Sequence, residues 1–253
     1  MRIAAGIAIA VALSVAASAG AQKNPEVAQI SVWKVKPGAT AAFEAGRARH
    51  MAFHAAQKDS WSWFTWEVVN GDRAGQYLTG SFNHFWKDFD GRDAFDKLDN
   101  ADVDKNLGAN SEVTTTGYWT YMTEASRAQP GTTGPAAYAQ LTHYMVNPAD
   151  TPRFEDALKE IKADLDKAEW PIYSAWYRLS SGGEGPHYVV STRRDNFAAF
   201  APLDKSLIEA VAGVAGPRRA AELFDIVRSS TRSVYTEVLK LRSDLSYVAP
   251  AAK

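Results

Sequence analysis

An internal repeat constrains the fold of this chain more than any other feature. The segments AQISVWKVKPGATAAFE (residues 28–44) and AQLTHYMVNPADTPRFE (residues 139–155) align without a gap at an offset of 111 residues and are identical at seven of seventeen positions. Self-similarity at a long fixed period indicates that one structural unit occurs twice. The chain is therefore expected to fold as two copies of the same unit.

Each unit has the same pattern of predicted elements. In the first, a strand (about 27–36) ends at a proline, a helix follows (about 40–58), and two strands form a hairpin across an Asn-Gly pair at 70–71. Proline cannot donate to a sheet ladder, and Asn-Gly is a strong signal for a tight turn. A broken helical stretch (about 84–108) and a last strand complete the order βαββαβ.

A single βαββαβ unit forms a four-stranded antiparallel sheet with both helices on one face, so its other face is bare. Two units can cover each other by packing these bare faces together. We therefore predict an α+β fold of tandem ferredoxin-like repeats packed sheet to sheet as a pseudo-dimeric barrel. The predicted divisions are a signal peptide at 1–21, a first repeat at 22–122, a linker rich in proline, glycine, serine and threonine at 123–137, a second repeat at 138–247 and a tail at 248–253.

The element order, the strand-proline-helix start and the aromatic second strand resemble the dimeric α+β barrel superfamily, in particular its NIPSNAP-like and antibiotic-biosynthesis-monooxygenase-like members. This resemblance covers nearly all of the mature chain. Because one chain already supplies both halves of the barrel, the fused repeat favours a monomer with an internal pseudo-dimer, and further assembly stays open. From the known members the resemblance implies a cofactor-independent monooxygenase, a haem-binding or haem-degrading protein, an isomerase or a dehalogenating enzyme. Ligands in that superfamily usually lie between a unit's own helices and sheet, and no family catalytic motif can be carried over residue by residue.

The N-terminus and the composition bear on location and partners. Residues 1–21 contain one arginine, an apolar run and Ala-Ser-Ala or Ala-Gly-Ala cleavage sequences, which is the layout of a secretory signal too short for a membrane span. With no cysteine and a net charge of −1, the chain has no lipidation site, no disulfide and no basic stripe for nucleic acid. We expect a periplasmic or secreted protein without a membrane anchor after cleavage.

The two copies differ on one helix face. In the second copy, the apolar residues Phe154, Ala157, Leu158, Ile161 and Leu165 recur at helical spacing and should lie on the sheet. At the same offset the first copy has Phe43, Gly46, Arg47, His50 and His54. Polar groups on a buried face must be paired, solvated or in contact with a ligand. Two interpretations stay open: a polar-lined cleft widened by Gly46, or a rotated helix whose histidines meet water or a carboxylate.

Arg47, His50 and His54 are the candidate catalytic residues. The histidines are one helical turn apart on one face, a spacing that can chelate a transition metal, with Glu44, Glu67 or His84 as third ligands by residue type. Non-covalent haem on one histidine, with Arg47 near a propionate, is a second option. Acid-base chemistry is a third, in which Arg47 stabilises an enolate or carboxylate. The sequence itself requires no cofactor.

Other polar motifs have simpler interpretations. His143 and His187, taken singly, are expected to be structural. The acidic run at 93–106 lacks the glycine and terminal glutamate of a calcium loop, so a solvated helix face is predicted there.

The segment SWSWFTWEVV (60–69) contains three tryptophans. Because side chains alternate along a strand, Trp63 and Glu67 share one face and Trp66 lies on the other, where Trp176 is its expected counterpart in the second copy. Trp63 and Glu67, with Trp33 and Tyr77 on other strands of the first repeat, are the candidate ligand-binding residues. The predicted function is binding or transformation of a small apolar or aromatic molecule in the helix–sheet cleft of the first repeat, monooxygenase-like or isomerase-like. The alternative is a non-catalytic periplasmic ligand- or haem-binding protein.

Overall fold

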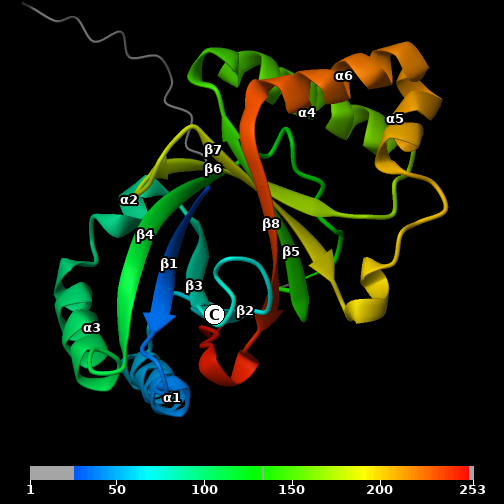
Figure 1. Ribbon diagram of the computed structural model, residues 1–253. Helices are drawn as coiled ribbons and strands as arrows, with labels where there is room; N and C mark the ends of the chain where they lie inside the picture. The colour runs from blue at the N-terminus through cyan, green and yellow to red at the C-terminus, as the bar shows by residue number, and fades with distance from the viewer. Residues whose placement is uncertain (1–25, 133, 251–253) are drawn as a thin grey trace, which may run out of the picture.

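The computed structural model describes residues 26–132 and 134–250, and its elements follow the βαββαβ order twice (Figure 1). The first repeat contains β1 (Val27–Val35), α1 (Thr40–Gln57), β2 (Phe64–Val68), β3 (Tyr77–His84), α2 (Trp86–Phe89), α3 (Asp93–Asn106) and β4 (Ser111–Tyr121). The second contains β5 (Tyr138–Val146), η1 (Pro148–Asp150), α4 (Thr151–Lys167), β6 (Ser174–Ser181), β7 (His187–Arg194), η2 (Phe197–Phe200), α5 (Leu207–Ala215), α6 (Pro217–Ser230), β8 (Thr231–Leu241) and η3 (Ser243–Leu245). The predicted signal peptide, residues 1–21, lies outside the described residues.

The eight strands form one closed barrel in the order β1-β3-β2-β8-β5-β7-β6-β4. Two antiparallel seams, β2 with β8 and β4 with β6, join the repeats. Closure leaves no sheet edge open for pairing with another chain. The prediction of two ferredoxin-like repeats in a pseudo-dimeric α+β barrel is confirmed, and the repeats meet along both sheet edges as well as across the barrel interior.

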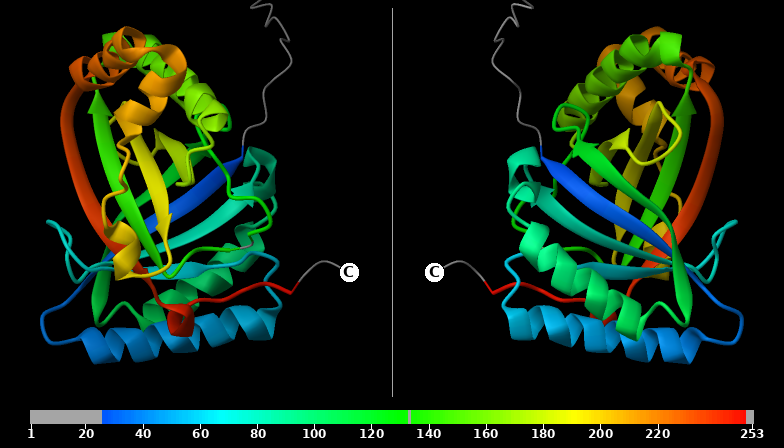
Figure 2. Two further views of the ribbon diagram at one scale, coloured as in Figure 1. Left: turned by 90° about the vertical axis from the view of Figure 1, so that its right-hand side faces the viewer. Right: turned by 90° about the vertical axis from the view of Figure 1, so that its left-hand side faces the viewer.

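The helices cover the outside of the barrel in two groups. Figure 2 shows α1 and α3 along one side and α4, α5 and α6 on the opposite side. None of the helices in the described part of the chain is both long enough and apolar enough to span a membrane.

The predicted difference between the two first helices is present in the structure. The helix α4 buries its whole apolar stripe, Phe154, Ala157, Leu158, Ile161 and Leu165. On α1, Arg47, His50 and His54 are only 2%, 2% and 1% exposed. The interpretation in which α1 is rotated and its histidines meet water is therefore wrong. The histidines do contact carboxylates, the other partner considered in that interpretation, as shown below.

Gly46 serves a different purpose from the one predicted. A Cβ atom at this position would lie 2.2 Å from the backbone oxygen of Asn106, at the end of α3. The missing side chain therefore does not widen a cleft. It lets α3 approach α1 closely, which brings the acidic side chains of α3 against the buried face of α1.

Replacing Gly46 by alanine should lower the free energy of unfolding by about 1–3 kcal/mol, the range for overpacking, in spite of alanine's higher helix propensity. The reason is that α3 must move away from α1 to admit the new methyl group. Urea denaturation measures the change. Gly91→Ala is the control, because a Cβ there meets nothing within 4 Å; equal effects of the two substitutions would rule out this role for Gly46.

The side chains of β2 and of the tryptophans just before it alternate between two faces as predicted, and the structure shows which face meets the helix. Trp66 packs in the apolar cluster inside the barrel, whereas Trp63 faces α1, with its ring 5.7 Å from that of His54. Trp176 stacks on Tyr144 on the helix side of the second repeat, outside the barrel. The predicted equivalence of Trp66 and Trp176 is therefore wrong by one residue.

Candidate metal centre

The predicted site residues fall into two groups along α1. His50, His54 and Trp63 lie together near its C-terminal half. Trp33 and Tyr77 pack on Phe43 near its N-terminus.

The second group has structural partners of its own. The indole N–H of Trp33 donates to Thr79, the Tyr77 hydroxyl donates to Glu44, and the Glu67 carboxylate lies 3.6 Å from Arg242. None of these contacts involves His50 or His54. The ligand-binding role of Trp33, Tyr77 and Glu67 therefore remains a prediction.

Asp59 orients His54. Its Oδ2 atom lies 2.9 Å from His54 Nδ1 and accepts from the indole N–H of Trp63 and from Arg92. Burial raises the pKa of Asp59, but the hydrogen bonds from His54, Arg92 and Trp63 outweigh it and hold that pKa far below its ordinary value. An ionised carboxylate can only accept, so His54 Nδ1 carries the hydrogen and, in the neutral ring, Nε2 carries a free lone pair.

Asp102 plays the same part for His50. Its Oδ1 atom lies 2.8 Å from His50 Nδ1 and also accepts from the side-chain amide of Asn106. Burial foremost, and then the charge of Arg47, lower the pKa of His50 to about 3, so the ring is neutral near pH 7. His50 Nδ1 therefore donates, and its Nε2 also carries a free lone pair.

The two Nε2 atoms face each other and a third acceptor. They are 3.2 Å apart, and Asp99 Oδ1 lies 3.2 Å from His54 Nε2 and 3.6 Å from His50 Nε2. Asp99 Oδ1 is buried and has no donor among the described residues. Three lone-pair atoms thus converge on one point, an arrangement that is unfavourable unless a cation or a shared proton lies between them.

A divalent transition metal suits this triangle. Zinc lies ~2.0–2.1 Å from histidine nitrogen, which puts the ligand atoms of a tetrahedral site roughly 3.3 Å apart. The distances of 3.2, 3.2 and 3.6 Å match that spacing. Metal-binding histidines usually donate their other nitrogen to a carboxylate, as both do here. The competing occupant is one proton on Asp99, whose pKa is raised by burial.

The third ligand was not among the residues predicted from sequence. Glu44 bonds to Tyr77, Glu67 is close to Arg242, and His84 bonds to Ser81, so none of them joins the histidines. The prediction of a solvated face for 93–106 is wrong for Asp99 and Asp102, which turn toward α1. The sequence did contain a signal for this contact. Residues 95, 99, 102 and 106 lie on one helical face at the spacing of a buried stripe, but three of the four are polar.

His84 is instead a buried neutral histidine. Its ring stacks on Trp61 with centroids 3.6 Å apart, and burial foremost lowers its pKa to about 4 from 6.5. Between these two values the unfolded chain binds more protons than the folded chain, so stability should fall as the pH is lowered from 6.5 to 4.

The contribution of His84 is expected to be about 1–3 kcal/mol. It can be measured as the difference in free energy of unfolding between the wild type and His84→Phe at several pH values. A difference that stays constant from pH 7 to 4 would show that His84 is protonated equally in both states.

The histidine cluster does not fit haem. A porphyrin supplies four in-plane ligands to its iron and leaves protein ligands only the two opposite faces. His50 Nε2, His54 Nε2 and Asp99 Oδ1 converge on one point, so three protein atoms would compete for a single face of the porphyrin. The prediction of haem on His50 or His54 is therefore not supported by the geometry.

Arg47 is the remaining predicted catalytic residue, and it is buried beside the cluster. Its Nε donates to Thr65, while Nη2 is buried with no acceptor among the described residues. Burial foremost lowers the pKa of Arg47 to about 10, so it stays charged near pH 7. Its charge in turn lowers the pKa of both His50 and Asp99.

The cluster is close to the molecular surface on one side. The Asp99 side chain is 22% exposed, against 2% and 1% for the two histidines. A hollow of about 340 Å³ adjoins this region, bordered by Asp59, Trp61, Arg92 and Phe95. The hollow borders Asp59, the hydrogen-bond partner of His54, and does not include His50, His54 or Asp99 in its lining.

Comparisons with known proteins identify the fold. Neither a protein-family model nor a curated protein matches the sequence. Among solved structures, one described as a monooxygenase of Lactobacillus acidophilus NCFM is similar at TM-score 0.53 and 10% identity, covering 89% of this chain and 97% of its own. An anthrone oxidase-like protein is similar at TM-score 0.54 and 14% identity, covering 87% and 92%.

A chlorite dismutase from Candidatus Nitrospira defluvii, solved with imidazole, is similar at TM-score 0.51 and 9% identity, covering 88% of this chain and 93% of its own. Identities this low show the fold alone. The chain has the dimeric α+β barrel fold of monooxygenase-like and chlorite dismutase-like proteins, as the sequence resemblance implied.

Proposed function

We propose that this protein is a metal-dependent α+β barrel enzyme whose first repeat binds one divalent first-row transition metal ion and acts on a small apolar or aromatic molecule. The ligands are His50 Nε2, His54 Nε2 and Asp99 Oδ1. The observation that carries the proposal is the convergence of these three lone-pair atoms within 3.6 Å of one another. We further propose that the protein acts in the periplasm or outside the cell, on the basis of the signal-like residues 1–21.

The ligand set supports a catalytic rather than a purely structural ion. Structural zinc sites are closed by four protein ligands, whereas catalytic sites keep a position for water or substrate. Only three metal-binding side chains converge among the described residues. Two histidines and one carboxylate with free positions are also the ligand set of non-haem iron oxygenases.

The chain's own residues then have distinct tasks. Asp59 and Asp102 hold the two histidines in the tautomer that presents Nε2. An ion held by His50, His54 and Asp99 would supply Lewis-acid polarisation of a substrate oxygen. Arg47, whose Nη2 has no acceptor among the described residues, would offer a donor to negative charge on that oxygen. Trp63 and the aromatic side chains of Phe53 and Phe95 surround the histidines and favour an apolar or aromatic substrate.

Metal stoichiometry tests the proposal. Protein stripped with chelator and dialysed against Zn²⁺, Co²⁺, Mn²⁺ or Fe²⁺ under anaerobic conditions should retain one ion per chain, measured by plasma mass spectrometry. His54→Ala and Asp99→Asn should retain none. Asp96→Asn is the control, since it removes an exposed carboxylate of the same helix. The proposal fails if the wild type retains no ion, or if Asp99→Asn and Asp96→Asn behave alike.

A further inference from the structure

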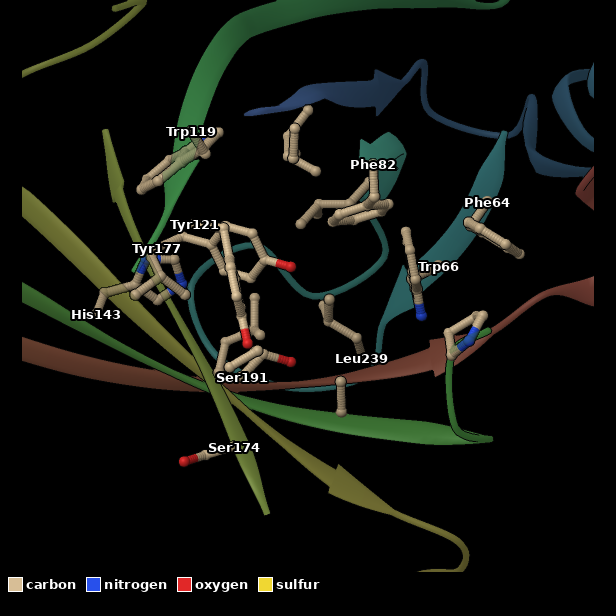
Figure 3. Close-up of a pocket in the computed structure, with 18 of the residues that line it drawn as sticks. Phe64, Trp66, Phe82, Trp119, Tyr121, His143, Ser174, Tyr177, Ser191 and Leu239 are labelled. Carbon is tan, nitrogen blue, oxygen red and sulfur yellow. The ribbon is translucent and has the colours of Figure 1, made fainter. Parts of the chain in front are cut away.

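The barrel encloses a second site, separate from the metal cluster. A cavity of about 780 Å³ lies inside the barrel and is lined mainly by apolar side chains, among them Phe64, Trp66, Phe82, Trp119, Leu141 and Leu239 (Figure 3). Pockets of this size hold drug-sized ligands. Linker residues, including Gln129 and Pro135, border the same cavity.

Two tyrosines bring hydroxyl groups into this apolar space. Tyr121 on β4 and Tyr177 on β6 are paired across a seam between the repeats, with ring centroids 5.4 Å apart. Both side chains extend into the cavity (Figure 3). Neither hydroxyl is among the side-chain hydrogen bonds of the described residues, so both are free to bond to a ligand.

A chain of hydrogen bonds that starts at Glu237 fixes the tautomers of two histidines, His143 and His187. Arg73 and His143 both donate to Glu237. Burial raises the pKa of Glu237, but these hydrogen bonds outweigh it and leave that pKa below its ordinary value. The ionised carboxylate accepts from His143 Nε2 at 3.2 Å, so the neutral His143 ring presents a lone pair at Nδ1.

His143 Nδ1 then accepts from His187 Nε2 at 3.0 Å, which leaves the lone pair of His187 on Nδ1. Burial foremost lowers the pKa of His187 to about 4, so this ring is neutral near pH 7. His187 and Tyr177 lie on neighbouring strands, two residues apart across the pairing of Tyr177 with Val189, and both line the cavity. The residues that line the cavity therefore include a histidine with a free lone pair on Nδ1 and two tyrosines with free hydroxyl groups.

The charged residues of the cavity lining are Glu26 and the three arginines Arg73, Arg127 and Arg193. Arg73 is bonded to Glu237, Arg127 to Asp166 and to the backbone oxygen of Ile172, and Arg193 to the backbone oxygen of Gly134. Arg73 and Arg127 are thus paired with carboxylates, whereas the Nε of Arg193 is buried without an acceptor among the described residues. Burying an unpaired ionic group in such an apolar space would be costly.

We infer that the barrel interior binds a neutral aromatic molecule that carries a phenolic hydroxyl, which donates to His187 Nδ1 and lies beside Tyr121 and Tyr177. This site uses no atom of the metal cluster. It places a second ligand site between the repeats, whereas the metal cluster belongs to the first repeat alone.

Calorimetric titration of the full chain with 1-naphthol, naphthalene and 1-naphthyl phosphate tests the inference. One net hydrogen bond is worth ~0.5–1.5 kcal/mol, so 1-naphthol should bind roughly 2- to 13-fold more tightly than naphthalene. The phosphate should show no binding. His187→Phe should remove the preference for 1-naphthol over naphthalene.

Two variants locate the site. Leu239→Trp, or Ala139→Leu if the first does not fold, should reduce the binding of both compounds at least tenfold by filling the cavity. Tyr144→Phe, on the helix side of β5, should change neither. Chelator-treated protein and His54→Ala should bind 1-naphthol as the wild type does, which separates this test from that of the metal centre. Equal affinity for 1-naphthol and naphthalene, no binding of either, or binding unaffected by the filling variants would each overturn the inference.

Discussion

Replacing Asp59 by alanine is expected to lower the free energy of unfolding by about 3–5 kcal/mol, the cost of removing one partner from a buried charged network. The Asp59 carboxylate is 2% exposed and accepts from His54, from the backbone of Trp61, from the indole of Trp63 and from Arg92. Without it, His54, the Trp61 backbone and the Trp63 indole lose their acceptor in a buried environment, and the Arg92 guanidinium keeps, among the described residues, only the exposed carboxylate of Asp96. Urea denaturation of chelator-treated protein measures the effect.

The matched control for this substitution is Asp96→Ala. Asp96 also pairs with Arg92, but its side chain is 53% exposed, and exposed pairs of this kind contribute at most about 1 kcal/mol. A loss on Asp59→Ala no larger than that on Asp96→Ala would mean that Asp59 does not organise the buried network.

Saturating metal is expected to stabilise the folded chain strongly. A ligand at 1,000 times its dissociation constant adds about 4 kcal/mol to the free energy of unfolding when it binds only the folded state. The gain should appear as a metal-dependent rise in the midpoint of thermal or urea unfolding. It should vanish in Asp99→Asn and in the double variant His50→Leu/His54→Leu, whose second-repeat counterparts are Ile161 and Leu165.

Two further measurements make this prediction specific. Asp96→Asn should keep the full gain, and excess EDTA should abolish the gain in the wild type. If zinc shifts the unfolding midpoint equally in the wild type and in Asp99→Asn, the stabilisation does not come from this cluster, and a proton shared between Asp99 and the histidines becomes the better explanation of the geometry.

Comparison of the two repeats within one sequence predicted more than the separate motifs did. The 111-residue offset identified α1 as the helix whose buried face had become polar, and the structure confirms that Arg47, His50 and His54 are buried. The same offset predicted the helix–strand order and the fused barrel. These features follow from periodicity, which a sequence shows directly.

The missing ligand and the close helix contact depend on tertiary structure. Asp99 is one acidic residue in a charged run, and only the approach of α3 to α1 at Gly46 distinguishes it from its solvated neighbours. The sequence alone places four residues on one helical face: Phe95, Asp99, Asp102 and Asn106. A face with mostly polar residues is ordinarily interpreted as solvated.

The ligand cavity inside the barrel was hidden for a related reason. Strand residues that face the interior are apolar whether the interior is filled or open, so the pattern cannot distinguish a core from a pocket. Trp66 and Tyr177 both follow the expected alternation, yet the volume of the barrel interior depends on how the barrel closes. His143 and His187 were expected to be structural when taken singly. Only their hydrogen bonds to each other and to Glu237 indicate a candidate binding role.

Anomalous diffraction is the most direct test of the metal centre. Crystals grown with Zn²⁺ and measured on both sides of the zinc absorption edge should show one strong peak per chain, about 2.0–2.2 Å from His50 Nε2, His54 Nε2 and Asp99 Oδ1. The account is contradicted if, at a zinc concentration that saturates the protein in solution, no peak lies between these atoms or the ion is bound elsewhere.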